Sequence, residues 1–82
     1  MQVQVKLFGP LAQAAATRTA SVELPAGQAN CAALREALTR RYPQLRDALA
    51  TCRLAVNHEF VGDATPIALG DEVALIGQVS GG

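Results

Sequence analysis

The sequence holds few of the residues that commonly carry chemistry. It has no tryptophan, one histidine and two cysteines, and its seven basic residues balance seven acids, so the formal net charge is zero. No basic patch emerges, which argues against a nucleic-acid partner. No apolar run approaches the ~18 residues of a membrane span, and the N-terminus does not resemble a signal peptide. We expect a cytoplasmic protein without membrane or nucleic-acid contacts.

Catalytic motifs are also missing. Cys31 and Cys52 lack the close spacing of redox or zinc motifs, so we interpret them as small buried hydrophobes in a reducing compartment, with no disulfide indicated. His58 has no neighbouring ligand set and is interpreted as a turn residue. No serine lies in a G-x-S-x-G motif. Without a nucleophile, base or metal site, the chain is not expected to act as an enzyme by itself.

Half of the residues are apolar, and their spacing predicts the elements. Residues 2–8 and 19–24 alternate apolar and polar side chains, as do residues 52–57, and 59–61 form a short return strand. Residues 72–76 form a last strand that is apolar on both faces. Residues 31–42 form a helix with Asn30 as its N-cap and Pro43 as its stop, and residues 11–16 and 45–50 add short helical turns.

The predicted helix over 31–42 has one apolar stripe. Its members recur every three or four residues and face the core: Cys31, Leu34, Leu38, Tyr42 and Leu45. We expect the arginines of this helix, among them Arg35 and Arg40, to form its solvated face. Asp71 and Glu72 follow a glycine at a turn, and we expect that pair to be solvated as well.

The order of elements indicates an α+β roll of one domain over residues 1–82. Its mixed sheet has about four to five strands, with one main helix packed on one face. The first and last strands are the most apolar, so we expect them side by side and parallel in the centre. Residues 77–82 then form a flexible extended tail.

The last five residues read QVSGG. Gly81 and Gly82 have no side chain to pack, and glycine can thread a narrow channel and take φ values that other residues avoid. A carboxylate is a poor electrophile, but its acyl-adenylate is a good one, and a sulfur nucleophile then leaves a thiocarboxylate. Each of these steps needs the end group inside another protein's active site.

Several segments in one register carry a resemblance: VQVKLFGPLAQAA, ALREALTRRYP, LAVNHEFV and LGDEVALIGQVSGG. Together they resemble the ubiquitin-like β-grasp sulfur carriers, the family of the small subunit of molybdopterin synthase and of the thiamine-pathway carrier. The most telling parts are AVN, GDEVA and the VSGG end. One departure is Gln78, where the family often has proline.

The resemblance implies a function for the glycine pair. An E1-like enzyme would use ATP to adenylate the carboxylate of Gly82, and a sulfurtransferase route would convert it to a thiocarboxylate. Gly81 is the slim approach to that group. The large subunit of molybdopterin synthase would then take the tail into its active site and deliver the sulfur to a cyclic pterin precursor. The chain itself would bind neither cofactor nor metal.

Three alternatives stay open: a carrier for thiamine or another sulfur-containing metabolite, a ubiquitin-like protein modifier, and a plain β-grasp interaction module. A docking surface is expected in each case, because the last strand is apolar on both faces. The residues expected to contribute to it are Phe8, Phe60, Ala74, Ile76 and Val79.

Overall fold

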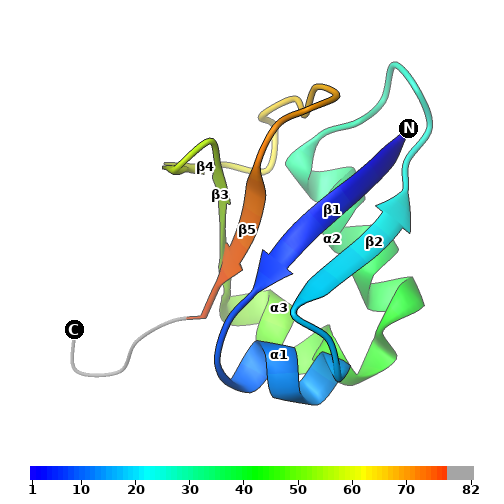
Figure 1. The fold of residues 1–82 in the computed structure, drawn as a ribbon. Helices are drawn as coiled ribbons and strands as arrows, with labels where there is room; N and C mark the ends of the chain where they lie inside the picture. Colours follow the sequence, from blue (N-terminus) through cyan, green and yellow to red (C-terminus); the bar gives the residue numbers. More distant parts are fainter. Residues whose placement is uncertain (78–82) are drawn as a thin grey trace.

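The computed structural model describes residues 1–77 and contains a mixed sheet of five strands (Figure 1). The strands are β1 (Gln2–Leu7), β2 (Thr19–Glu23), β3 (Arg53–Val56), β4 (Glu59–Val61) and β5 (Val73–Ile76), in the order β2-β1-β5-β3-β4. The expected central pairing is confirmed, because β1 and β5 are parallel neighbours with Val5 opposite Val73. The expected tail at 77–82 lies outside the described residues except for Gly77.

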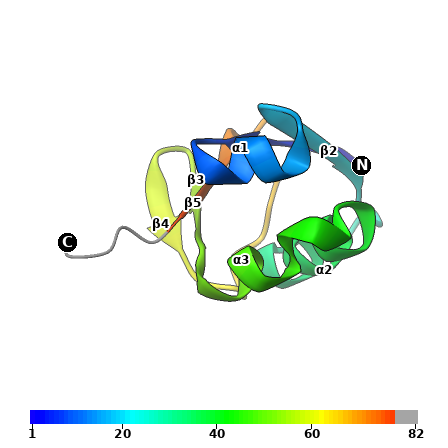
Figure 2. The same ribbon diagram turned by 90° about the horizontal axis from the view of Figure 1, so that it is seen from below.

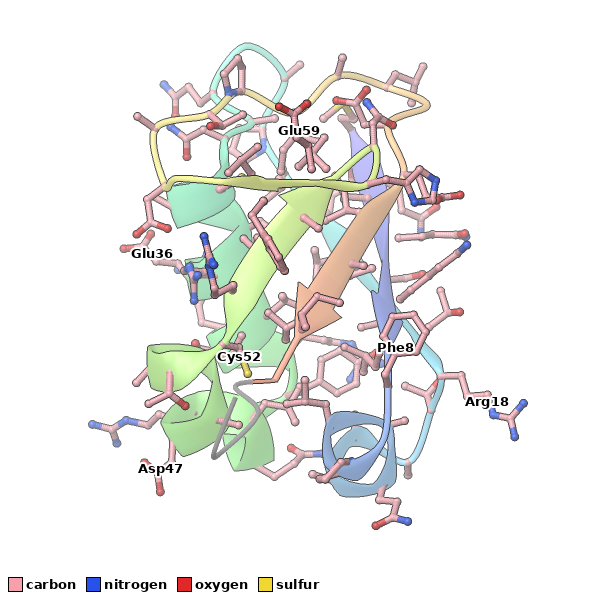
Figure 3. All side chains as sticks on the ribbon, turned by 90° about the vertical axis from the view of Figure 1, so that its left-hand side faces the viewer. Phe8, Arg18, Glu36, Asp47, Cys52 and Glu59 are labelled. Atoms are coloured by element: carbon pink, nitrogen blue, oxygen red, sulfur yellow. The ribbon has the colours of Figure 1, made fainter. Side chains whose placement is uncertain are left out.

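One main helix, α2 (Cys31–Arg41), covers one face of the sheet, as the sequence predicts (Figure 1). The shorter helices α1 (Pro10–Ala15) and α3 (Arg46–Thr51), with the 3₁₀ turn η1 (Pro43–Leu45), lie at the end of the sheet where β1 and β5 finish (Figures 1 and 2). No helix within residues 1–77 is long and apolar enough to cross a membrane. The other face of the sheet has no helix over it in the described part of the chain (Figure 3).

The core joins the inward positions of the strands to the stripe of α2. Leu34, Leu38 and Leu45 are fully buried, as their spacing predicts, and they meet Leu54 and Leu75 of the central strands. Tyr42, expected in the same stripe, is only half-buried, because α2 ends at Arg41 and the chain turns away there. Ala37, three residues after Leu34, is buried as well, although it was not assigned to the predicted stripe.

The N-terminus of α2 is capped from two directions. The side chain of Asn30 accepts a hydrogen bond from the backbone N–H of Ala33 at 2.8 Å, which confirms the predicted N-cap. The loop before β5 supplies two more acceptors, because Cys31 N–H donates to Thr65 O and Ala32 N–H donates to Asp63 O. The loop at 62–72 is thereby held against the helix.

The prediction that the arginines of α2 form a solvated face is wrong for Arg35. Its Nη1 donates to Leu49 O at 2.6 Å and its Nη2 donates to Cys52 O at 2.8 Å. Its Nε donates to Asp63 Oδ1 at 2.9 Å. The reason is tertiary: α3 ends beside α2, and the last carbonyls of a helix have no partner within the helix itself. Arg40 is exposed, as expected.

Candidate functional site

The uncovered face of the sheet carries an apolar patch. Its members are Phe8, Ala55, Phe60, Ala74 and Ile76, which line a shallow hollow of ≈ 320 Å³. Along β5 the side chains alternate, so Val73 and Leu75 enter the core while Ala74 and Ile76 stay half-buried on the opposite face. Ala55 pairs with both Phe60 and Ala74 across the strands, which brings residues of three strands together.

Two aromatic side chains make this patch unusual for a sheet surface. Phe8 is 55% exposed and Phe60 is 52% exposed, although apolar groups of this size are normally removed from water. Of the five residues expected on a docking surface, the structure brings four to this hollow, and Val79 lies outside the described residues. The role of the patch in partner binding stays a prediction.

Polar and charged side chains border the patch. Glu72 joins two of them, since its Oε1 lies 3.3 Å from Lys6 Nζ and its Oε2 lies 2.8 Å from His58 Nε2. On the side of β3, the guanidinium of Arg53 stacks 4.2 Å from the centre of the Phe60 ring. The predicted turn position of His58 is confirmed. The apolar centre of the patch has polar groups at its border, as in protein–protein interfaces.

The two motifs AVN and GDEVA meet at the edge of this face. Asn57 Nδ2 donates to Asp71 Oδ1 at 3.1 Å, and Glu72 N–H donates to Asn57 Oδ1 at 3.0 Å. Asn57 has φ 53°, in the left-handed region that asparagine tolerates better than most residues. This contact was not predicted from the sequence, although the occurrence of both motifs in one register was a signal for it.

Asp71 has a structural role beyond that of a solvated turn carboxylate. Its Oδ2 also accepts a hydrogen bond from Ala68 N–H at 2.8 Å. This backbone bond, followed by the bond from Asn57, holds the pKa of the Asp71 carboxyl below its ordinary value. The ionised carboxylate therefore fastens the turn that leads into β5, and with it the position of Glu72 on the border of the patch.

A second hollow, of ≈ 680 Å³, adjoins the patch at the end of β5. We call it the α1–α3 groove, because α1 and α3 supply its walls; it is lined by Phe8, Gly9, Pro10, Leu11, Ala48, Thr51, Cys52, Ile76 and Gly77. Phe8 and Ile76 line both hollows. Figure 3 shows Phe8 and Cys52 on either side of the end of β5. The last described residue, Gly77, thus leaves the sheet on the wall of the groove, next to Ile76, which lines both hollows.

The two thiols do not supply a reactive group to this site. Cys31 and Cys52 are free and buried, as the sequence analysis predicts. Burial raises the pKa of the Cys52 thiol, and the nearby charge of Arg35 only partly opposes that rise. Within residues 1–77 no group of histidine, cysteine and acidic residues could hold a metal ion. Gly81 and Gly82 lie outside the described residues.

Known proteins resemble this chain in both sequence and fold. The model of the ThiS family matches residues 5–82. A molybdopterin synthase sulfur carrier subunit from Mycobacterium tuberculosis is 36% identical over 83 residues, covering 100% of this chain and 99% of the relative. The crystal structure of SAMP1 from Haloferax volcanii superposes with a TM-score of 0.87 at 30% identity, over 100% of both chains.

A third similar structure comes from a complex. It is that of subunits 1 and 2 of the molybdopterin-converting factor from Helicobacter pylori, in which the matching chain has a TM-score of 0.70 and 25% identity, with 100% of both chains covered. The structure and these matches confirm the β-grasp fold that the sequence resemblance implied.

Proposed function

The chain belongs to the ThiS family of ubiquitin-like sulfur carriers, and on that premise we propose that it is the sulfur-donating small subunit of a molybdopterin synthase. The observation that carries the proposal is the match to a curated molybdopterin synthase subunit over the whole chain, at 36% identity. The apolar patch and the glycine pair at residues 81–82 give the proposal a surface and a reacting end.

We place the chemistry at the carboxylate of Gly82. An E1-like enzyme uses ATP to join this carboxylate to AMP, with release of pyrophosphate. Sulfur delivered as hydrosulfide through a sulfurtransferase route then attacks the acyl carbon, the bond to AMP breaks, and a thiocarboxylate remains once the S–H proton is lost. The thiocarboxylate passes its sulfur to a cyclic pterin precursor. Catalytic side chains come from the partner proteins, and the two free cysteines agree with the reducing cytoplasm as the location.

The large subunit is the proposed partner of the chain once Gly82 carries the thiocarboxylate. The similar chain in the Helicobacter pylori structure is solved together with subunit 2 of its factor. The patch supplies apolar anchors in its centre and charged groups at its border, which is the arrangement of a protein-binding surface. We propose that Phe8, Phe60, Ala74 and Ile76, with Val79, bind the partner while the C-terminal residues enter its active site.

The decisive test is deletion of Gly82. The chain then stops ~3.5 Å short, and misplacement of even ~1 Å can cost ~100-fold in rate. We expect thiocarboxylate formation and molybdopterin synthesis to be lost while thermal melting stays that of the parent. The fold should persist because the buried core of the described chain runs from Val3 to Leu75. Near-normal turnover by the deleted chain would eliminate the carrier function.

Two further variants locate the requirement. One added residue after Gly82 should abolish activity by displacing the carboxylate, and Gly81→Val should reduce it, because a β-branched residue is wider and restricted in φ. The product is read by mass spectrometry of the intact chain, which gains the mass difference between sulfur and oxygen. A tail without function would tolerate both changes.

A second candidate function is protein modification. The observation that favours it is the structural similarity to SAMP1, with a TM-score of 0.87. SAMP1 is the small archaeal modifier protein 1 of Haloferax volcanii. A modifier would join Gly82 to a lysine of another protein through an amide bond. Mass spectrometry separates the two functions, because a modifier yields target peptides that carry the C-terminal residues of this chain on a lysine, whereas a carrier yields the thiocarboxylate form of the free chain. Trypsin leaves residues 54–82 on the target lysine, since no lysine or arginine follows Arg53.

A further inference from the structure

The α1–α3 groove adjoins the point at which the C-terminal residues leave the sheet. Gly77 and Ile76 line it directly, and Ile76 and Phe8 also line the apolar patch. The two hollows are therefore parts of one surface around the end of β5 (Figure 3). Only the patch was expected from the sequence, since the walls of the groove come from α1 and α3, which are far apart in the chain.

The short C-terminal segment requires a partner to come close to this point. Residues 78–82 span at most ~18 Å even when fully extended. A protein that holds Gly82 in its active site therefore has its own surface within ~18 Å of Gly77. Because Gly77 lies on the wall of the groove, a partner that also binds the patch lies next to the mouth of the groove.

The residues that line the α1–α3 groove favour an apolar side chain as its occupant. Among the described residues, no charged side chain lines the α1–α3 groove, whereas Lys6, His58 and Glu72 border the patch. Leu11, Ala48 and Ile76 present aliphatic surface, and Cys52 is a nearly buried thiol. A charged group placed there would lose water without gaining a charged partner and would find only the Thr51 hydroxyl among the lining side-chain oxygens, whereas an apolar side chain would bury aliphatic surface.

We infer that the α1–α3 groove receives an apolar side chain of the large synthase subunit. That subunit thus contacts the surface around Gly77 at both the groove and the patch. This inference rests on the proposed function, because the large subunit is the protein proposed to take up Gly82. The groove then supplies a second, uncharged contact that fixes the direction in which residues 78–82 enter the partner. Docking on the patch alone would leave that direction less constrained.

Two neighbouring exposed residues of α3 give a matched test. Thr51 lines the groove, while Ala50 lines a separate hollow beside Arg46. The dissociation constant of the large subunit of the same organism is measured by calorimetry for the parent, Thr51→Arg, Ala50→Arg and Phe60→Ala. We expect Thr51→Arg to weaken binding about tenfold or more, and Ala50→Arg to stay within about twofold. Thr51→Gln replaces Thr51→Arg if that chain does not melt cooperatively.

The Phe60→Ala variant separates the inference from the proposed function. Phe60→Ala changes the patch without touching the groove, and it should also weaken binding. If Phe60→Ala weakens binding but Thr51→Arg matches Ala50→Arg, the groove is not a contact and the inference alone fails. If the parent does not bind the large subunit, the proposed function fails with it. Tighter binding by Thr51→Arg would show that the groove holds residues 78–82 of the free chain, which would overturn the inference.

Discussion

Arg35 connects three segments of the chain through a single side chain. It donates to Leu49 O and Cys52 O at the end of α3, and to Asp63 in the loop after β4. Its side chain is only 23% exposed, so these bonds are partly shielded from water. Arginine suits this position because its planar group carries several donors in a fixed arrangement, whereas lysine offers one point charge.

We predict that Arg35→Ala lowers the free energy of unfolding by about 1.5–3 kcal/mol, because hydrogen bonds from a charged donor are lost and the carbonyls at the end of α3 lose their partner. Arg35→Lys should recover only a small part of this loss. Urea unfolding checks both variants. Arg40→Ala, at an exposed position of the same helix, is the control and should stay within about 0.5 kcal/mol of the parent. Equal stability of the Arg35 and Arg40 variants would contradict the role of Arg35.

Because of Asp71, the free energy of unfolding should fall as the pH becomes acidic. Hydrogen bonds from Ala68 and Asn57 lower its pKa in the folded chain below the ordinary value of 3.8. As pH falls, the unfolded chain therefore takes up its proton first, and folding loses stability. The contribution of Asp71 is complete at neutral pH, declines as pH falls through about 4, and is lost below the lowered pKa.

The variant Asp71→Asn should remove this part of the pH dependence. Unfolding is followed in urea at several values between about pH 5 and pH 2, where a carboxyl with a lowered pKa loses its contribution. The parent should lose more stability over this range than the variant does. Parallel curves for the two chains would show that Asp71 is not bonded more strongly in the folded state.

At the scale of elements, α2 is the part of the fold that depends most on its buried stripe. Leu34 and Leu38 are fully buried between α2 and the sheet. We predict that Leu38→Ala costs about 2–5 kcal/mol, since the lost methyl groups leave a cavity in a closely packed core. A domain of this kind has roughly 5–15 kcal/mol in all, so the loss is large. Thermal melting of Leu38→Ala is compared with that of Glu36→Ala, an exposed position of α2, and similar melting temperatures would mean that the helix packs through another face.

Strand β5 links the fold to the site. Its inward residues Val73 and Leu75 pair it with β1 and β3 in the core, and its outward residues Ala74 and Ile76 form the centre of the patch. The strand then ends at the point where the C-terminal residues begin. This central strand therefore positions both the proposed docking surface and the origin of the segment that carries Gly82.

At the scale of the whole molecule, the proposed function requires one surface to serve two successive partners. Residues 78–82 reach at most ~18 Å from Gly77, so the proposed activating enzyme and the proposed large subunit must both approach the end of β5. We predict that they bind in a mutually exclusive manner, and that added large subunit inhibits adenylation because it competes with the activating enzyme for the chain. Pull-down of the activating enzyme with increasing large subunit measures this. A stable ternary complex of the three proteins would contradict the prediction.

Much of this architecture follows from the sequence by itself. Alternation marked the strands, the three-four spacing marked α2, and the strong apolarity of the first and last strands predicted their parallel pairing. Phe8, Phe60, Ala74 and Ile76 were expected on one surface because β5 is apolar on both faces. The motifs and the glycine pair indicated the family. These features are local or periodic, so the physical preference of each short segment is sufficient to predict them.

Only the tertiary structure decided the contacts between distant segments. Arg35 meets Asp63 across 28 positions, Asn57 meets Asp71 across 14, and the α1–α3 groove joins residues near 10 to residues near 50. An arginine on a helix or a carboxylate at a turn has the same local pattern whether it faces water or a backbone group of another element. Packing of α3 against α2 and the register of β5 on β3 determine which of these occurs, and neither is written in the spacing of neighbouring residues.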